Sequence, residues 1–160
     1  MATKVLMVCL GNICRSPMAE GLLRHKIRQL NLDIETDSAG TAGYHIGSKP
    51  DNRMIETAAK FGVDISDLRA RQFKSTDLDE FDYIFAMDKE NQLNMQRLAT
   101  NEKGKEKVKL FLEHVDYPNY NEVPDPYYGS MKDFEFVFNM LNDATDKFVN
   151  QLIQNKILNY

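Results

Sequence analysis

The segment Lys4-Val5-Leu6-Met7-Val8-Cys9-Leu10-Gly11-Asn12-Ile13-Cys14-Arg15-Ser16-Pro17 sets the architecture of this chain. The aliphatic, partly β-branched run from Lys4 to Cys9 predicts a short buried strand, and Gly11-Asn12 is a turn signal. Ser16 is a suitable N-cap, and Pro17 suits the first position of a helix, where its missing N–H costs nothing. The stretch therefore predicts a strand, a tight loop and a helix. Apolar residues continue at helical spacing after it, at Ala19, Leu22, Leu23, Ile27 and Leu30.

The same alternation of strand and helix continues to the end of the chain, with a long loop rich in Pro and Tyr at 114–130 before the last helix. Strands that alternate with helices imply right-handed crossovers and a mostly parallel sheet. We expect a single α/β domain over residues 1–160, doubly wound, with a mostly parallel four-stranded sheet and helices on both faces. The further elements predicted are a strand over Leu32–Ser38, a helix over about 51–60 that Pro50 opens and Gly62 closes, a strand over Tyr83–Met87, a helix from Asp88 to about Thr100, a strand over Val108–Leu112 and a helix over 131–157.

Composition narrows the function classes. The 160 residues include 20 Lys and Arg against 24 Asp and Glu, so a generally basic nucleic-acid binder is disfavoured. The longest apolar runs are only a few residues, far below the roughly 20 that a bilayer requires, and the N-terminus lacks the pattern of a signal peptide. We expect a cytoplasmic protein with no membrane insertion and no nucleic-acid partner. Two cysteines and three histidines show no zinc-ligand spacing, so no metal or cofactor is expected.

The loop between the first strand and the first helix has the features of an oxyanion site. Its successive N–H groups curve into a helix N-terminus, which attracts anions. Gly11 permits a backbone conformation that a side chain would forbid, and Arg15 can hold two phosphate oxygens with its planar fork. The same field favours the thiolate of Cys9, and Ser16 could donate to its sulfur. A cysteine that ends a strand is usually a core residue, but its combination with Arg15 and a Pro-started helix favours a nucleophile.

The run Val8-Cys9-Leu10-Gly11-Asn12-Ile13-Cys14-Arg15-Ser16-Pro17-Met18-Ala19-Glu20 resembles the signature of the low-molecular-weight protein tyrosine phosphatases, and Asp125-Pro126-Tyr127-Tyr128-Gly129 resembles their acidic loop. The resemblance implies a phosphate loop between the first strand and the first helix. It also implies that Cys9 attacks phosphorus to form a phosphocysteine, while Arg15 binds the equatorial oxygens. Asp125 would protonate the leaving group and then activate water, with no metal required.

The substrate that this resemblance implies is a phosphotyrosine-containing protein or a small aryl phosphate. Tyr44, Tyr127 and Tyr128 could form the walls of an aromatic slot. Ile13 favours tyrosine, because family members directed at phosphoarginine tend to have threonine there; phosphoarginine is the alternative substrate. The remaining predicted substrate-binding residues come from the loop: Leu10, Gly11, Asn12, Cys14 and Ser16.

Several residues have subsidiary roles by the same resemblance. Asn12 and Ser38 would support the phosphate loop, whereas Leu68 stands where the family usually has a supporting histidine. Independently of the resemblance, Cys14 lies in the same tight loop as Cys9, so it is either a simple packing residue or a second thiol that forms a reversible disulfide with Cys9 and protects it from overoxidation. In some family members the two tyrosines that match Tyr127 and Tyr128 are phosphorylated. The resemblance therefore implies that a tyrosine kinase could be a regulatory partner.

Other polar residues are interpreted more simply. Asp88 is interpreted as an N-cap, the charge-rich segment Asn101 to Lys109 as a solvated helix end or loop, and no catalytic role is assigned to His25, His45 and His114.

Two other function classes remain open. Arsenate reductases share the fold and a similar loop, but they relay electrons through downstream cysteines, and no cysteine follows Cys14 here. A phosphocysteine carrier would need the nucleophile but not an acid, so Asp125 separates it from a hydrolase.

Overall fold

A four-stranded parallel sheet forms the centre of the computed structural model, which describes residues 2–158. Its strands are β1 (Thr3–Cys9), β2 (Ile34–Gly40), β3 (Tyr83–Ala86) and β4 (Val108–Leu110), in the order β2-β1-β3-β4. β1 therefore lies between two neighbours, with Cys9 beside Gly40 of β2 and Val8 beside Ala86 of β3. The carboxyl end of β1 thus lies between the carboxyl ends of β2 and β3. Parallel α/β sheets bind their ligands at this edge.

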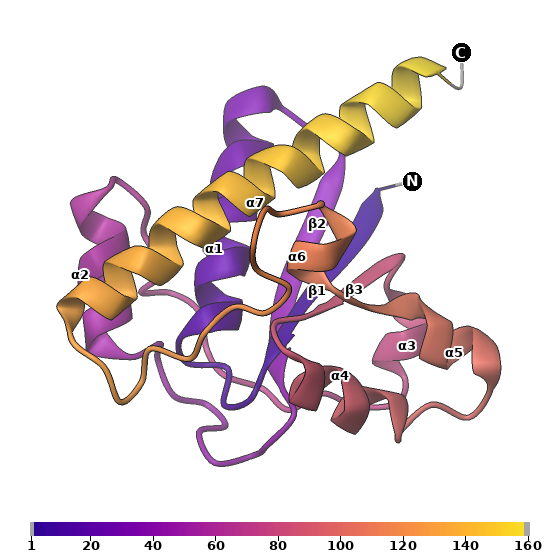
Figure 1. Cartoon of the computed structure of the whole chain (residues 1–160), viewed down its shortest axis with the longest axis horizontal. Helices are drawn as coiled ribbons and strands as arrows, with labels where there is room; N and C mark the ends of the chain where they lie inside the picture. Colours follow the sequence, from indigo (N-terminus) through magenta and orange to yellow (C-terminus); the bar gives the residue numbers. More distant parts are fainter. Residues whose placement is uncertain (1, 159–160) are drawn as a thin grey trace.

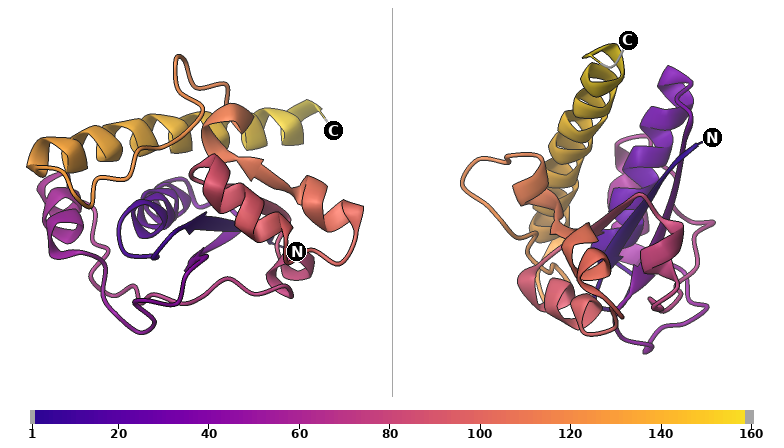
Figure 2. Two further views of the ribbon diagram at one scale, coloured as in Figure 1. Left: turned by 60° about the horizontal axis from the view of Figure 1, so that its bottom comes forward. Right: turned by 90° about the vertical axis from the view of Figure 1, so that its right-hand side faces the viewer.

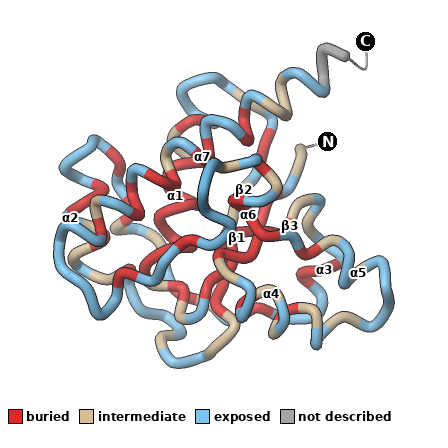
Figure 3. Tube along the Cα trace, in the orientation of Figure 1, coloured by how far each residue is buried: buried red, intermediate tan, exposed pale blue. Residues whose placement is uncertain are grey.

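Helices cover both faces of the sheet, as predicted (Figures 1 and 2). On one face, Val5 and Met7 of β1 belong to the larger hydrophobic cluster, which takes in residues of four helices. On the other face, Leu6 and Val8 join a smaller cluster with Leu78 and Met95. Figure 3 shows the buried residues gathered along the sheet and the helices that cover it. The helices are α1 (Arg15–Leu30), α2 (Asn52–Lys60), α3 (Asp77–Glu80), α4 (Lys89–Gln96), α5 (Glu102–Lys107), α6 (Phe111–His114) and α7 (Met131–Leu158).

The predictions that Ser16 caps α1 and that Pro17 is its first residue are both wrong. The helix already begins at Arg15, with Cys14 in the N-cap position and no side-chain capping bond. The hydroxyl of Ser16 is instead buried and contacts the sulfur of Cys9. Local propensity favours a serine cap, but here the tertiary contacts of the hydroxyl prevail.

Other boundaries moved where short elements meet. β2 begins at Ile34 rather than Leu32 and extends to Gly40, because pairing with β1 continues to Cys9. α4 ends at Gln96 rather than Thr100. β4 ends at Leu110, and the residues predicted to finish it form the short helix α6. Part of the charge-rich segment forms α5, whose N-terminus Asn101 caps by accepting from the Gly104 N–H at 2.8 Å.

No helix in the described part of the chain is long and apolar enough to span a bilayer.

Candidate active site

The loop after β1 forms the floor of a cavity of about 350 Å³. Cys9 ends the strand and is only 3% exposed. It nevertheless lines this cavity. The Sγ atom of Cys9 lies 3.0 Å from Oγ of Ser16. The expected contact between the serine and the sulfur is therefore present.

A chain of buried hydrogen bonds connects Ser16 to Asn12, Ser38 and Glu20. Asn12 Nδ2 donates to Ser16 Oγ at 2.8 Å and to Ser38 Oγ at 2.9 Å, while its Oδ1 accepts from the Arg71 N–H at 3.0 Å. Ser38 Oγ in turn donates to Glu20 Oε1 at 2.6 Å. The hydroxyl of Ser16 has one hydrogen and two acceptors within reach, the Cys9 sulfur at 3.0 Å and the Ala39 carbonyl at 3.3 Å. When it donates to an ionised sulfur, the bond is charge-assisted. A charge-assisted bond of this kind stabilises a thiolate.

Asn12 and Gly40 show how tightly the loop is folded. Asn12 is buried with a φ of 58°, a left-handed conformation that asparagine tolerates better than most residues. A Cβ on Gly40 would lie 2.8 Å from the Leu10 carbonyl oxygen and 3.0 Å from the Gly11 carbonyl carbon. Only glycine lets the end of β2 approach the loop this closely. The sequence shows Gly40 as one of several loop glycines, and nothing in its spacing marks this contact.

Arg15 is held from three sides. Its Nη1 donates to Asp88 Oδ2 at 2.6 Å and to the Val123 carbonyl at 3.0 Å, and its Nη2 lies 3.7 Å from Asp125 Oδ2. Burial acts to lower the pKa of Arg15, but the negative charges of Cys9, Asp88 and Asp125 outweigh it and raise the pKa. The guanidinium is therefore a permanent, oriented cation on the wall of the cavity.

Asp88 makes two contacts, of which the sequence predicted only the helix cap. It caps α4, as expected, with its Oδ1 accepting from the Asn91 N–H at 2.8 Å. Its other oxygen makes the short bond to Arg15. The sequence reveals the cap through its position before a helix, but it contains no signal for a pairing between residues so far apart.

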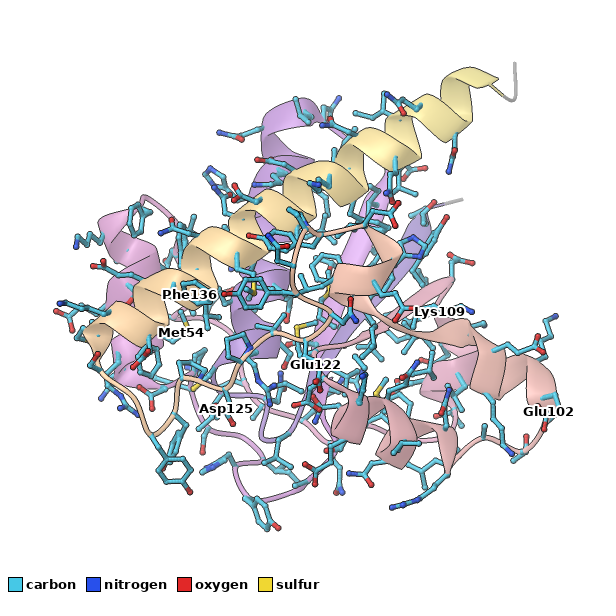
Figure 4. All side chains as sticks on the ribbon, viewed as in Figure 1. Met54, Glu102, Lys109, Glu122, Asp125 and Phe136 are labelled. Carbon is cyan, nitrogen blue, oxygen red and sulfur yellow. The ribbon has the colours of Figure 1, made fainter. Side chains whose placement is uncertain are left out.

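Asp125 lines the same cavity. Figure 4 shows it on the loop between α6 and α7. Its side chain is 40% exposed, and its Oδ1 accepts from the Tyr127 N–H at 3.1 Å. Cys9, Arg15 and Asp125 thus line one cavity, and the sequence predicts these residues as nucleophile, phosphate-binding cation and acid. This convergence brings an acidic group within reach of anything bound to Arg15.

Aromatic side chains surround the mouth of the cavity. Tyr127 and Tyr128 pack edge to face with ring centroids 4.9 Å apart, and Tyr128 is 94% exposed. His45 also lines the cavity, a role that the sequence did not indicate. Asn12 and Ser16, which are also predicted to contact substrate, are buried and are not among the residues that line the cavity. The predicted substrate-binding residues that line the cavity are Leu10, Gly11, Ile13, Cys14, Tyr44, Tyr127 and Tyr128.

Cys14 and Leu68 both have largely apolar surroundings. Burial is the largest influence on Cys14, followed by the charge of Asp51, and both raise the pKa of its thiol. Cys14 therefore stays protonated. Leu68 packs against the main hydrophobic cluster and supplies no hydrogen bond from its side chain. The backbone N–H of Arg71 makes the described contact with Asn12 Oδ1.

A family model, curated relatives and solved structures all match this chain over nearly its whole length. The family model described as low molecular weight phosphotyrosine protein phosphatase matches residues 4–157. A putative low molecular weight protein-tyrosine-phosphatase from Synechocystis sp. is 45% identical, with 93% of this chain and 96% of that protein covered. The crystal structure of YfkJ from Bacillus subtilis superposes with a TM-score of 0.90 at 37% identity, with 98% of each chain covered.

A protein tyrosine phosphatase from Entamoeba histolytica, crystallised with Hepes in the active site, gives a TM-score of 0.89 at 38% identity, covering 97% of this chain and 99% of that one. The matches span the whole domain, including the Cys9 loop and the Asp125 loop. The chain therefore belongs to the low molecular weight phosphotyrosine protein phosphatase family.

Proposed function

We propose that this enzyme hydrolyses phosphotyrosine in proteins, and small aryl phosphates, through a phosphocysteine at Cys9. The observation that carries the proposal is that Cys9, Arg15 and Asp125 line a single cavity of about 350 Å³. A cysteine nucleophile, an oriented cation and a carboxyl group at one point are the parts that covalent phosphoryl transfer requires.

In the first half-reaction the Cys9 thiolate attacks phosphorus and the bond to the phenolic oxygen breaks. Arg15 and the loop N–H groups hold the equatorial oxygens, and Asp125 gives its proton to the departing phenolate. In the second half-reaction the Asp125 carboxylate takes a proton from water, which attacks phosphorus. The S–P bond then breaks, which restores the thiolate and releases phosphate. Ser16, supported by Asn12 and Ser38, stabilises that thiolate at the start and end of the cycle.

The cavity supports tyrosine as the phosphorylated residue. Tyr44, Tyr127 and Tyr128 offer faces and edges to a flat ring, and Ile13 adds apolar bulk where a planar, branched guanidinium would need room and hydrogen-bond acceptors. The position of Asp125 beside Arg15 supports hydrolysis rather than storage of the phosphoryl group, because a phosphocysteine carrier has no use for an acid and base.

Regulation and location form part of the same proposal. Tyr128 is almost fully exposed and so accessible to a tyrosine kinase. Cys14 lines the same cavity as Cys9, which supports a reversible Cys9–Cys14 disulfide when peroxide oxidises the Cys9 sulfur. A thiolate nucleophile needs a reducing compartment, which supports a cytoplasmic location.

The test is hydrolysis of phosphotyrosine in the presence of a metal chelator. We expect activity with a bell-shaped pH profile on the acid side of neutrality, and its abolition by Cys9→Ser and by Arg15→Ala. Asp125→Asn should lower the maximal rate with little change in binding. Activity that survives Cys9→Ser, or that requires an added divalent metal, would refute the mechanism.

A further inference from the structure

The loop that carries Asp125 has few attachments to the rest of the protein. Its start is fixed where the Val123 N–H donates to the Met87 carbonyl at 2.8 Å, and its end is fixed where Ser130 enters α7. Between these points, the hydrogen bonds found in the described part of the chain include only one that joins residues 124–129 to another segment. That bond runs from Arg53 Nη2 to the Tyr127 carbonyl, at 2.9 Å.

Arg53 is itself held rigidly. Its Nε and Nη2 make two bonds to the Asp51 carboxylate, at 3.0 and 2.9 Å. Its Cζ lies 4.5 Å from the centre of the buried Phe134 ring and 5.5 Å from the centre of the Tyr127 ring. A planar guanidinium can make a two-point ion pair and stack on rings at the same time, which a lysine cannot do.

The other end of this connection is the phosphate loop. Asp51 caps α2, with its Oδ1 accepting from the Arg53 N–H, and its own N–H donates to the Ile13 carbonyl at 2.8 Å. A continuous path thus leads from Ile13 through Asp51 and Arg53 to the Tyr127 carbonyl. The N–H of Tyr127 then donates to the Asp125 carboxylate. Arg53 joins the two loops whose spacing the chemistry depends on.

We infer that Arg53 is a positioning residue that holds the Asp125 loop at the correct distance from the phosphate loop. This inference rests on the proposed function, because it takes Asp125 to be the acid. Arg53 does not line the cavity, so its influence on catalysis passes through Tyr127 and Asp125. Its loss should therefore act on leaving-group protonation and not on phosphate binding.

Substrates with different leaving groups separate these two effects. Phenolate needs a proton to depart, whereas p-nitrophenolate is stabilised by its nitro group and needs one much less. We expect Arg53→Met to lower kcat/KM for phenyl phosphate about tenfold and that for p-nitrophenyl phosphate less than about twofold. Arg53→Lys should behave similarly, since it keeps the charge but loses the fork. The inhibition constant of inorganic phosphate should stay within about twofold of the parent value.

Arg24→Met is the matched control. Arg24 makes the same set of bonds elsewhere on the surface, two to Asp67 at 2.8 Å each and one to the Asp64 carbonyl at 2.9 Å. Its removal should leave the ratio of the two substrates unchanged. In an Asp125→Asn background, Arg53→Met should no longer change that ratio, because the acid that it positions is gone.

Equal losses on both substrates, or weaker phosphate binding that accounts for the loss, would overturn the inference. So would a selective loss that persists in the Asp125→Asn background. If Asp125→Asn alone affected both substrates equally, the acid role of Asp125 would fail and the inference with it, a result distinct from failure of Arg53 alone.

Discussion

Glu20 is buried beneath the phosphate loop, and its charge should make stability depend on pH. Its side chain is 7% exposed and accepts a bond from Ser38. Burial is the main cause that raises the pKa of Glu20 from 4.5 to about 7, and the bond from Ser38 only partly opposes this. Glu20→Gln keeps the size and an acceptor for Ser38 but removes the ionisation.

The sign follows from the proton balance of the two states. Below the unfolded pKa of 4.5 the carboxyl is neutral in both states, so the substitution should change stability little. Between there and about 7 the unfolded chain releases the proton more readily, and the native protein loses stability as the pH rises. The rise of this pKa from 4.5 to about 7 corresponds to a free energy of about 3 kcal/mol, since one pKa unit is worth about 1.36 kcal/mol. The advantage of Glu20→Gln should therefore grow by about 3 kcal/mol up to pH about 8 and then level off.

Urea denaturation followed by circular dichroism, at several pH values from about 4.5 to 8, measures this difference for parent and variant. Glu56→Gln on α2 is the control, since Glu56 is exposed and its charge stays in water in both states. A stability difference between Glu20→Gln and the parent that is flat with pH, or that shrinks as the pH rises, would refute the reasoning.

Three further outcomes follow from the site. Gly40→Ala should inactivate the enzyme far more than it destabilises the fold, because the new Cβ would meet the Leu10 carbonyl oxygen; kcat and urea unfolding measured together check this, and full activity would contradict it. Asp88→Asn should raise the inhibition constant of inorganic phosphate about tenfold, because Arg15 loses its charged partner; unchanged inhibition would show that the Val123 carbonyl alone orients the guanidinium. Cys14→Ser should retain activity but lose its recovery by thiol after peroxide treatment, since no second thiol would protect Cys9; equal recovery in both proteins would remove that role.

The first strand, loop and helix could be predicted from the sequence because their signals are local. An apolar run, a turn and the start of a helix lie within one short segment, although the helix begins at Arg15 and Pro17 is its third residue. The placement of Cys9 and Arg15 at the carboxyl end of the first strand follows from that segment and the parallel topology. The two short motifs also predicted a common site for Cys9 and Asp125, which line one cavity although they are separated by more than a hundred residues.

The contacts that hold the site were decided only in the folded chain. Ser16 has a strong local preference to cap a helix, yet its buried hydroxyl contacts Asn12 and Cys9 instead. A buried hydroxyl needs such partners, because no water is there to bond to it. Arg15 donates to Asp88, and Arg53 donates to the Tyr127 carbonyl. The residues of each pair are far apart in the sequence, and no pattern in the sequence predicts such pairs. Sequence patterns record which face of an element is buried, whereas the partner of a buried charge depends on how distant elements pack, and packing exists only in three dimensions.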